Sequence, residues 1–77
     1  MRTLETISHP DFLISILYLN EKFLLKIEAG PYEQVYKFTR EMARDLDSVK
    51  KIITAEFLEN CKKSFDLMHQ GFVVQFQ

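Results

Sequence analysis

The chain has 77 residues and a mass of 9.1 kDa, enough for one domain with a modest hydrophobic core and too little for a deeply buried catalytic cleft. Hydrophobic residues make up 47% of the sequence and charged residues 27%, which is typical of a folded domain and not of a disordered chain. The formal net charge of -1 gives no long-range field that would attract nucleic acid or an anionic membrane. We therefore expect a single small domain, residues 1–77, with neither of these partners.

The cysteine content and the start of the sequence indicate where the protein resides. The single cysteine, Cys61, has no partner for an internal disulfide, so we expect a reducing, cytoplasmic environment. The first ten residues lack the apolar run of a signal peptide, and no apolar run is long enough to span a membrane.

Residues 12–19 and 22–29 predict a β-hairpin. The first segment is rich in β-branched and aromatic side chains, and the second alternates apolar and polar residues. With Asn20 and Glu21 as the two turn residues, the apolar side chains of both segments fall on one face of the hairpin.

A second turn at Gly30 and Pro31 predicts a third strand, residues 32–38. Glycine can take a positive φ at the first turn position, and the fixed φ of proline suits the next one. This turn continues the apolar face set by the first turn, whereas a slip of one residue would direct that face away from the core. The sequence thus predicts a three-stranded antiparallel meander whose first strand, residues 12–19, is an edge strand.

An alternative interpretation begins a helix at Pro31, because proline is favoured at the first helical position and apolar residues between 32 and 46 also recur at helical spacing. The agreement between the two turns favours a strand through Phe38 that is followed by a connection. Both interpretations of residues 32–46 remain open at this stage.

The spacing of apolar residues changes to three or four after Ser48. Ser48 can cap a short helical turn, and Thr54 can cap a longer helix whose first turn carries Glu56, a favourable charge at that end. We define the apolar stripe of this helix as the residues that recur along it and would lie on the sheet: Phe57, Cys61, Phe65, Met68, Phe72 and Phe76.

The apolar stripe continues past Gly71, which costs about 1 kcal/mol relative to alanine inside a helix. Residues 72–76 could instead form a short final strand, although the persistence of the stripe favours helix. The overall prediction is an α+β fold, in which one short and one long C-terminal helix pack on one face of the meander.

Two segments, "KFLLKIEAGPYEQVYKF" and "AEFLENCKKSFDLMHQ", resemble a group of small uncharacterised bacterial proteins with a sheet-forming first half and a helical second half. The resemblance covers roughly residues 8–70. It implies strand over helix for residues 32–38, and it implies no activity.

The sequence contains no catalytic or cofactor-binding pattern. Its two glycines, Gly30 and Gly71, are too far apart for a phosphate-binding loop, and two histidines with one thiol are too few for a typical metal site. Cys61 lies in the apolar stripe, which favours a core residue over a nucleophile. The lysine pairs at 50–51 and 62–63 are interleaved with acidic residues, as on a solvated face. We expect no enzyme activity, no cofactor, no metal and no nucleic-acid binding.

Gln34 falls on the apolar face of the predicted sheet, where a buried amide needs hydrogen-bond partners. It can bond a tyrosine, the backbone or water beneath the helices, and we favour this structural role. The alternative is a small-ligand-binding or regulatory site, lined by four polar residues of that face: Tyr18, Tyr32, Gln34 and Tyr36.

The opposite sheet face, here called the open face, carries apolar residues that two helices cannot also cover. Glu28 and Glu33 oppose each other on this face, where they can receive a cation or a partner's arginine, or lie screened in water. Apolar patches bordered by charge often mark protein interfaces. The leading hypothesis is a non-catalytic protein-interaction or homo-oligomerising module, most simply a homodimer, that uses the open face and the first strand. The expected interface comprises Leu13, Leu17, Leu19, Leu24, Lys26, Glu28 and Glu33.

Overall fold

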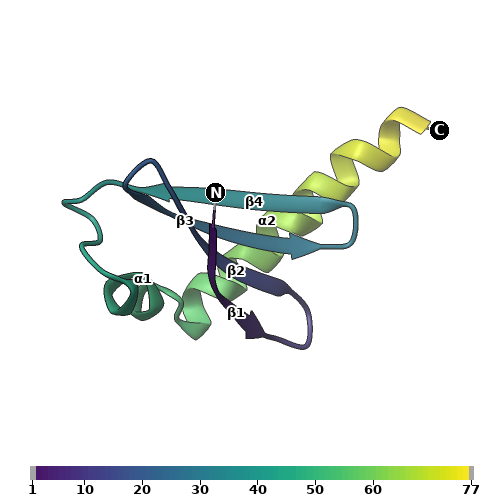
Figure 1. Cartoon of the computed structure of the whole chain (residues 1–77). Coiled ribbons are helices and arrows are strands. Elements are labelled where there is room, and N and C mark those ends of the chain that lie inside the picture. Colours follow the sequence, from purple (N-terminus) through teal and green to yellow (C-terminus); the bar gives the residue numbers. More distant parts are fainter. Residues whose placement is uncertain (1, 77) are drawn as a thin grey trace.

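A computed structural model describes residues 2–76 and shows a four-stranded antiparallel sheet followed by two helices (Figure 1). The strands lie in the sheet in chain order: β1 (Arg2–Ser8), β2 (Leu13–Leu19), β3 (Lys22–Ala29) and β4 (Tyr32–Phe38). The helical elements follow the sheet: α1 (Leu46–Ile52), α2 (Ala55–Val73) and a 3₁₀ turn (Val74–Phe76). The α+β class, the antiparallel meander and the two C-terminal helices are confirmed.

Both predicted turns set the register of the sheet. Asn20 and Glu21 have φ values of 51° and 63°, the positive values that a two-residue hairpin turn with the twist of a sheet requires. Gly30 has a φ of 60°, which glycine adopts at little cost. The cross-strand pairs are those that these two turns predict. The strand interpretation of residues 32–38 is confirmed, and the helical alternative is wrong for this segment.

The first strand, β1, corrects the prediction of three strands. It pairs with β2, so β2 is an internal strand and not the predicted edge strand. The pairing shifts by one residue between Thr3 and Glu5, and such a bulge breaks the alternation of apolar and polar residues by which a strand is recognised. The sequence still indicates where this strand ends, because Pro10 and Asp11 in the loop that follows β1 are typical turn residues.

An ion pair fastens β1 to α1. Glu5 lies opposite Ile16 and therefore on the sheet face that the helices cover, where a carboxylate oxygen lies 3.1 Å from the Lys50 ammonium nitrogen. An inward-facing charge and a bulge are both features that discourage another chain from pairing with an edge strand. The true first strand is therefore a poorer docking edge than the sequence suggested for residues 12–19.

The caps of the two helices decide where each begins. Asp45 caps α1, since its carboxylate accepts hydrogen bonds from the Ser48 backbone N–H at 2.9 Å and from the Ser48 hydroxyl at 2.7 Å. These bonds hold the pKa of Asp45 below its usual value. The predicted cap, Ser48, lies instead inside the first turn. Thr54 caps α2 as predicted, because its hydroxyl oxygen accepts from the Phe57 N–H at 3.1 Å.

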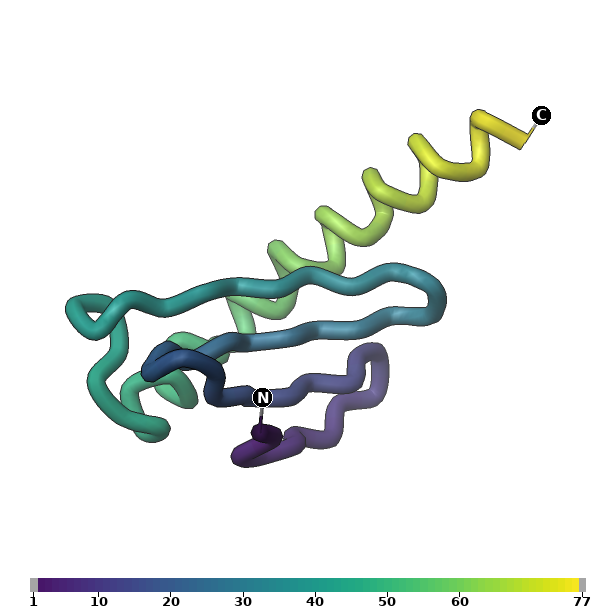
Figure 2. The backbone as a smooth tube through the Cα atoms, turned by 45° about the horizontal axis from the view of Figure 1, so that its top comes forward, coloured from purple at the N-terminus to yellow at the C-terminus, as the bar shows by residue number. Residues whose placement is uncertain are grey.

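The core lies between the sheet and the two helices, which pack on the same face (Figure 2). Cys61 is a buried free thiol in this core, in agreement with its predicted role. The largest fully buried side chains come from β2, β3 and both helices: Ile14, Ile16, Leu25, Ile27, Val49 and Cys61.

α2 extends well beyond the sheet, and the 3₁₀ turn prolongs it (Figures 1 and 2). Residues 72–76 are thus helical, as the persistence of the apolar stripe predicts. The extents of 44 × 25 × 21 Å reflect this projection. We call residues 66–76 the tail.

Candidate interaction surfaces

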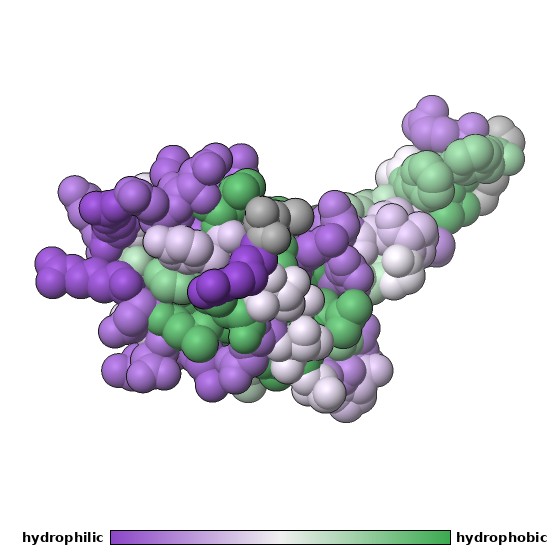
Figure 3. All heavy atoms as spheres, in the orientation of Figure 1, coloured by the Kyte–Doolittle hydropathy of each residue, from purple (hydrophilic) through white to green (hydrophobic). Residues whose placement is uncertain are grey.

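The open face is less apolar at its surface than the sequence suggests. Leu13 and Val35 are 50% and 46% exposed, whereas Leu17 and Leu24 are each only 8% exposed. Leu17 and Leu24 are cross-strand neighbours as predicted, but Leu17 also has Thr3 of β1 on its other side. The additional strand therefore flanks Leu17, in the middle of the expected interface. Figure 3 views this face and shows apolar groups broken up by polar ones.

Both opposed glutamates of the open face form ion pairs with one lysine of the same chain, which compensates one of their two charges. Glu28 and Glu33 are direct cross-strand partners, as predicted. The Lys26 ammonium nitrogen lies 2.8 Å from a Glu28 oxygen and 3.5 Å from a Glu33 oxygen. The hydrogen bond to Glu28, and then the charges of both carboxylates, hold the pKa of Lys26 above its usual value. Lys26, one of the predicted rim residues, is thus the cation that the two glutamates receive from their own chain.

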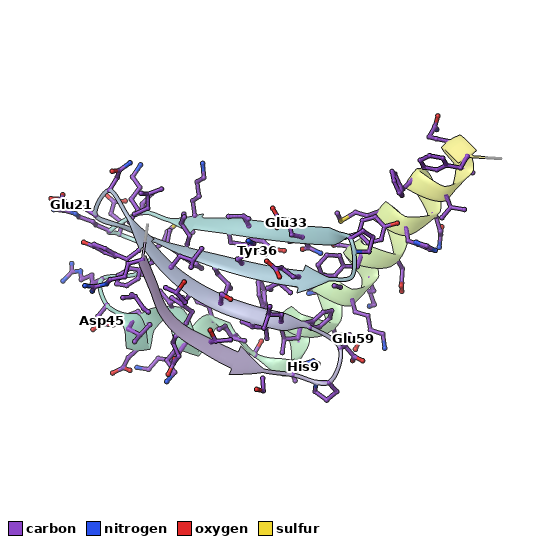
Figure 4. The ribbon with its side chains drawn as sticks, turned by 45° about the vertical axis from the view of Figure 1, so that its right-hand side comes forward. His9, Glu21, Glu33, Tyr36, Asp45 and Glu59 are labelled. Carbon is purple, nitrogen blue, oxygen red and sulfur yellow. The ribbon has the colours of Figure 1, made fainter. Side chains whose placement is uncertain are left out.

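Gln34 and Tyr36 of β4 form a hydrogen-bonded cluster with α2. The Gln34 Nε2 donates to the Cys61 carbonyl oxygen at 3.0 Å, and the Tyr36 hydroxyl donates to the Gln34 Oε1 at 2.5 Å. The Tyr36 hydroxyl also lies 3.7 Å from the Cys61 Sγ (Figure 4 labels Tyr36). Burial, followed by the bond to this thiol, raises the pKa of Tyr36 to about 12. The amide therefore has the partners that its structural role requires.

Tyr32 joins the sheet to α2 at the point where the helix leaves it. Its hydroxyl lies 2.8 Å from the His69 Nδ1, and its ring packs edge-on against the rings of His69 and Phe72 at centroid distances of 5.8 and 5.9 Å. These contacts fix the direction in which the tail projects. They also engage Tyr32 in a structural contact.

Tyr18 lies apart from the other three residues of the expected ligand site. It belongs to the cross-strand row of Phe23 and Phe38, at the opposite end of the sheet from Tyr32. There it borders an open cavity of about 480 Å³ between the β2–β3 turn and the loop that precedes α1. The remaining lining residues are Glu21, Phe23, Arg40, Glu41, Ala43 and Arg44.

Other titratable side chains form small, separate groups. His9 accepts a hydrogen bond from the Asp11 N–H at 3.1 Å and stacks on Phe12, so its ring is engaged in the loop after β1 (Figure 4). Within residues 2–76, no three His, Cys, Asp or Glu side chains lie close enough together to hold a metal ion. In the same part of the chain, neither helix has both the length and the apolar character needed to cross a membrane.

The tail carries a surface that sequence analysis did not identify as a site. Phe72 and Phe76 are 50% and 75% exposed, although both belong to the apolar stripe that was expected to lie on the sheet. Their rings pack edge-on at 4.9 Å, and apolar groups gather on the projecting helix in Figure 3. The length of the helix could have indicated this exposed surface, because 19 helical residues span about 28 Å and a seven-residue strand only about 23 Å.

Comparison of the chain with protein-family models, with curated proteins and with solved structures found no match. The resemblance to small bacterial proteins therefore stays a prediction. The function has to be argued from the surfaces of this chain.

Proposed function

We propose that this protein is a non-catalytic module that associates with a second copy of itself through apolar surface outside its core. The observation that carries the proposal is the apolar stripe of α2, which is buried where the helix crosses the sheet and exposed where the helix projects. A monomer gains nothing from apolar side chains of this size on one continuous face in water. A partner that covers them would gain hydrophobic stabilisation.

The amount of exposed surface supports the same proposal. The chain has an accessible surface of 5668 Å², whereas a compact monomer of its mass has about 4900 Å². The radius of gyration, 13.6 Å, likewise exceeds the value of about 11.5 Å for a compact chain of this length. The excess surface of about 800 Å² equals the area that one partner contributes to a stable interface of standard size.

The open face is the alternative surface for this association. Leu13, Leu19 and Val35 are its exposed apolar residues, and the Lys26 cluster borders them. Leu17 is too buried to test this surface by substitution, because a lysine there would place a charge in an apolar environment and destabilise the fold. Leu13 is the suitable position. The cytoplasmic location expected from the single cysteine stays a prediction.

The experiment that tests the proposal is the molar mass of the wild-type protein in solution. We expect sedimentation equilibrium to give twice the chain mass of 9.1 kDa as the concentration rises from micromolar to millimolar. The chain mass throughout this range would overturn the proposal.

A second candidate function is the binding of a small molecule, which the cavity beside Tyr18 favours. Its lining combines two aromatic rings with two arginines, Arg40 and Arg44, and two glutamates. A ring and an available arginine together suit an aromatic carboxylate. Arg40 already pairs with Glu21, which leaves Arg44 as the more available cation. Titration with benzoate, followed by the NMR signals of the Tyr18 ring in wild type and in Arg44→Gln, tests this candidate. Unchanged signals would eliminate benzoate-like ligands.

A further inference from the structure

The phenylalanines of the tail lie on the same side of α2 as its buried half, whereas the exposed Val74 lies on the opposite side. Helix geometry places Met68 and Phe72 within about 60° of Phe65 around the helix axis, and the 3₁₀ turn places Phe76 at about 80°. Leu67 lies about 200° from Phe65, so it occupies the opposite side of the helix although it is also exposed. The stripe that seals the core thus continues beyond Phe65, with Tyr32 at the end of β4 as its last contact with the sheet, beside His69 and Phe72.

The tail is almost free of charge. Within residues 64–76, Asp66 is the only Asp, Glu, Lys or Arg, whereas the preceding nine residues carry Glu56, Glu59, Lys62 and Lys63. Depletion of charge is characteristic of interface centres. Because no like charges would meet when two tails approach each other, nothing in their composition opposes pairing of identical chains.

The composition of the tail also argues against a membrane as its partner. Interfacial helices that bind membranes usually carry lysine and arginine on their polar face, next to the headgroups. No lysine or arginine follows Lys63 in the sequence. A protein surface is therefore the apolar environment that fits the tail.

Resting on the proposed self-association, we propose that the occupant of this surface is the tail of a second copy, packed antiparallel around a twofold axis at Phe72. In this arrangement Phe72 of each chain lies next to its counterpart. Met68 of one chain lies against Phe76 of the other, since each is four residues from the axis. Contact of a thioether with an aromatic ring is favourable, and the Phe76 ring would approach the partner's sheet near its Tyr32.

The contacts at Tyr32 hold the tail in a fixed orientation before it pairs. The bond from the Tyr32 hydroxyl to the His69 ring and the edge-on packing of Tyr32 on Phe72 orient the helix before a partner arrives. Surface that is already ordered loses less conformational entropy on binding than a flexible terminus would. The same contacts leave Phe76 free of the sheet, and it is the most exposed of the three stripe residues of the tail.

Three aspartate variants locate the interface. Phe76→Asp should raise the dimer dissociation constant by about 30-fold or more, because it removes the ring that packs on the partner's Met68 and introduces a charge at the helix contact. Leu67→Asp is the matched control on the same helix, and Leu13→Asp is the control on the open face. Both should change the constant less than about threefold. Far-UV circular dichroism verifies that each variant is folded.

The results separate this inference from the proposed function. A dimer that Leu13→Asp dissociates and Phe76→Asp leaves intact would overturn the tail arrangement and retain self-association. A wild-type monomer that binds phosphatidylcholine–phosphatidylserine vesicles, with binding lost in Phe76→Asp, would overturn both proposals in favour of a membrane. A wild-type monomer that does not bind such vesicles would also overturn both.

Cysteine cross-linking tests the orientation. In a Cys61→Ser background, Met68→Cys and Phe76→Cys chains are prepared separately, mixed above the dissociation constant and oxidised. The antiparallel arrangement predicts cross-linked dimers in the mixture and none from either chain alone. Identical positions would lie about 12 Å apart along the axis, beyond the reach of a disulfide. Cross-linking of each chain with itself would instead indicate parallel tails and overturn the arrangement.

Discussion

The two halves of α2 share one apolar stripe, which is buried in the first half and exposed in the second. In the first half, Cys61 and Phe65 are buried against the sheet, and in the tail Phe72 and Phe76 are at least half exposed. The spacing of the apolar residues is the same in both halves, so this spacing does not distinguish them. What differs is whether a strand lies underneath. An amphipathic pattern therefore shows that a helix has an apolar face to bury. It does not show whether that face packs on the same chain or on another molecule.

The comparison is sharpest at the two phenylalanines Phe65 and Phe76. Phe65→Ala should lower the free energy of unfolding by about 3–5 kcal/mol, because it opens a cavity beneath the sheet. Phe76→Ala should change it by less than about 0.5 kcal/mol in dilute solution, since its ring contacts no sheet residue there. Urea unfolding at micromolar concentration measures both values. Equal losses would mean that the tail packs within its own chain.

A second prediction concerns the polar anchor of the buried half. Gln34→Ala should lower the free energy of unfolding by about 1–3 kcal/mol, because it removes the bond to the Cys61 carbonyl and leaves the Tyr36 hydroxyl without its acceptor. Gln70→Ala, in the exposed tail, is the control and should have almost no effect. Urea unfolding of the two variants gives the comparison. A loss below about 0.5 kcal/mol in Gln34→Ala would show that this cluster contributes little.

The same anchor makes stability depend on pH at high pH. The pKa of Tyr36 is about 12 in the folded chain and 10.0 for an ordinary tyrosine, so folding favours the protonated hydroxyl group. Its contribution is fully present below pH 10 and is lost as the pH rises toward 12. The difference in urea midpoint between wild type and Tyr36→Phe should therefore be constant up to pH 9 and change between pH 10 and 12. A constant difference over the whole range would contradict this assignment.

The smallest effects are expected at the two turns, of which the β3–β4 turn lies next to the point where α2 leaves the sheet. Gly30→Ala should lower the free energy of unfolding by about 1 kcal/mol because of its φ of 60°, although the space around it is open. Glu21→Gly should raise it by about 0.5 kcal/mol, since glycine relieves the strain of a φ of 63°. Thermal unfolding measures both. Opposite signs would show that side-chain contacts outweigh backbone strain.

Much of the sheet could be predicted because its turns carry their own chemistry. Asn20-Glu21 and Gly30-Pro31 each define a register, and β3 and β4 were placed at their observed bounds. β1 was missed because the bulge between Thr3 and Glu5 removes the period of two. The predicted α1 cap was also wrong, because the carboxylate of Asp45, three residues before Ser48, accepts the Ser48 N–H and caps the helix.

The candidate surfaces were less predictable, because each depends on elements distant in sequence. Leu17 and Leu24 were expected at an interface, yet β1 flanks Leu17 and both are buried. The register pairs Glu28 with Glu33, but the ion pairs of Lys26 with both depend on side-chain positions that the register alone does not give. The position of Tyr18 beside a cavity depends on the loop that precedes α1, which carries no strong periodic signal.

The sequence by itself determined the turns, the register of β2 to β4 and the apolar stripe of α2, because these depend on contacts between near neighbours and on backbone preferences. Only the tertiary structure decided that a fourth strand flanks Leu17, and that the sheet ends before the stripe does. Those outcomes depend on where separate elements meet in space. The exposed face of the tail results from that mismatch in length, and it is the part of the molecule on which the proposed association rests.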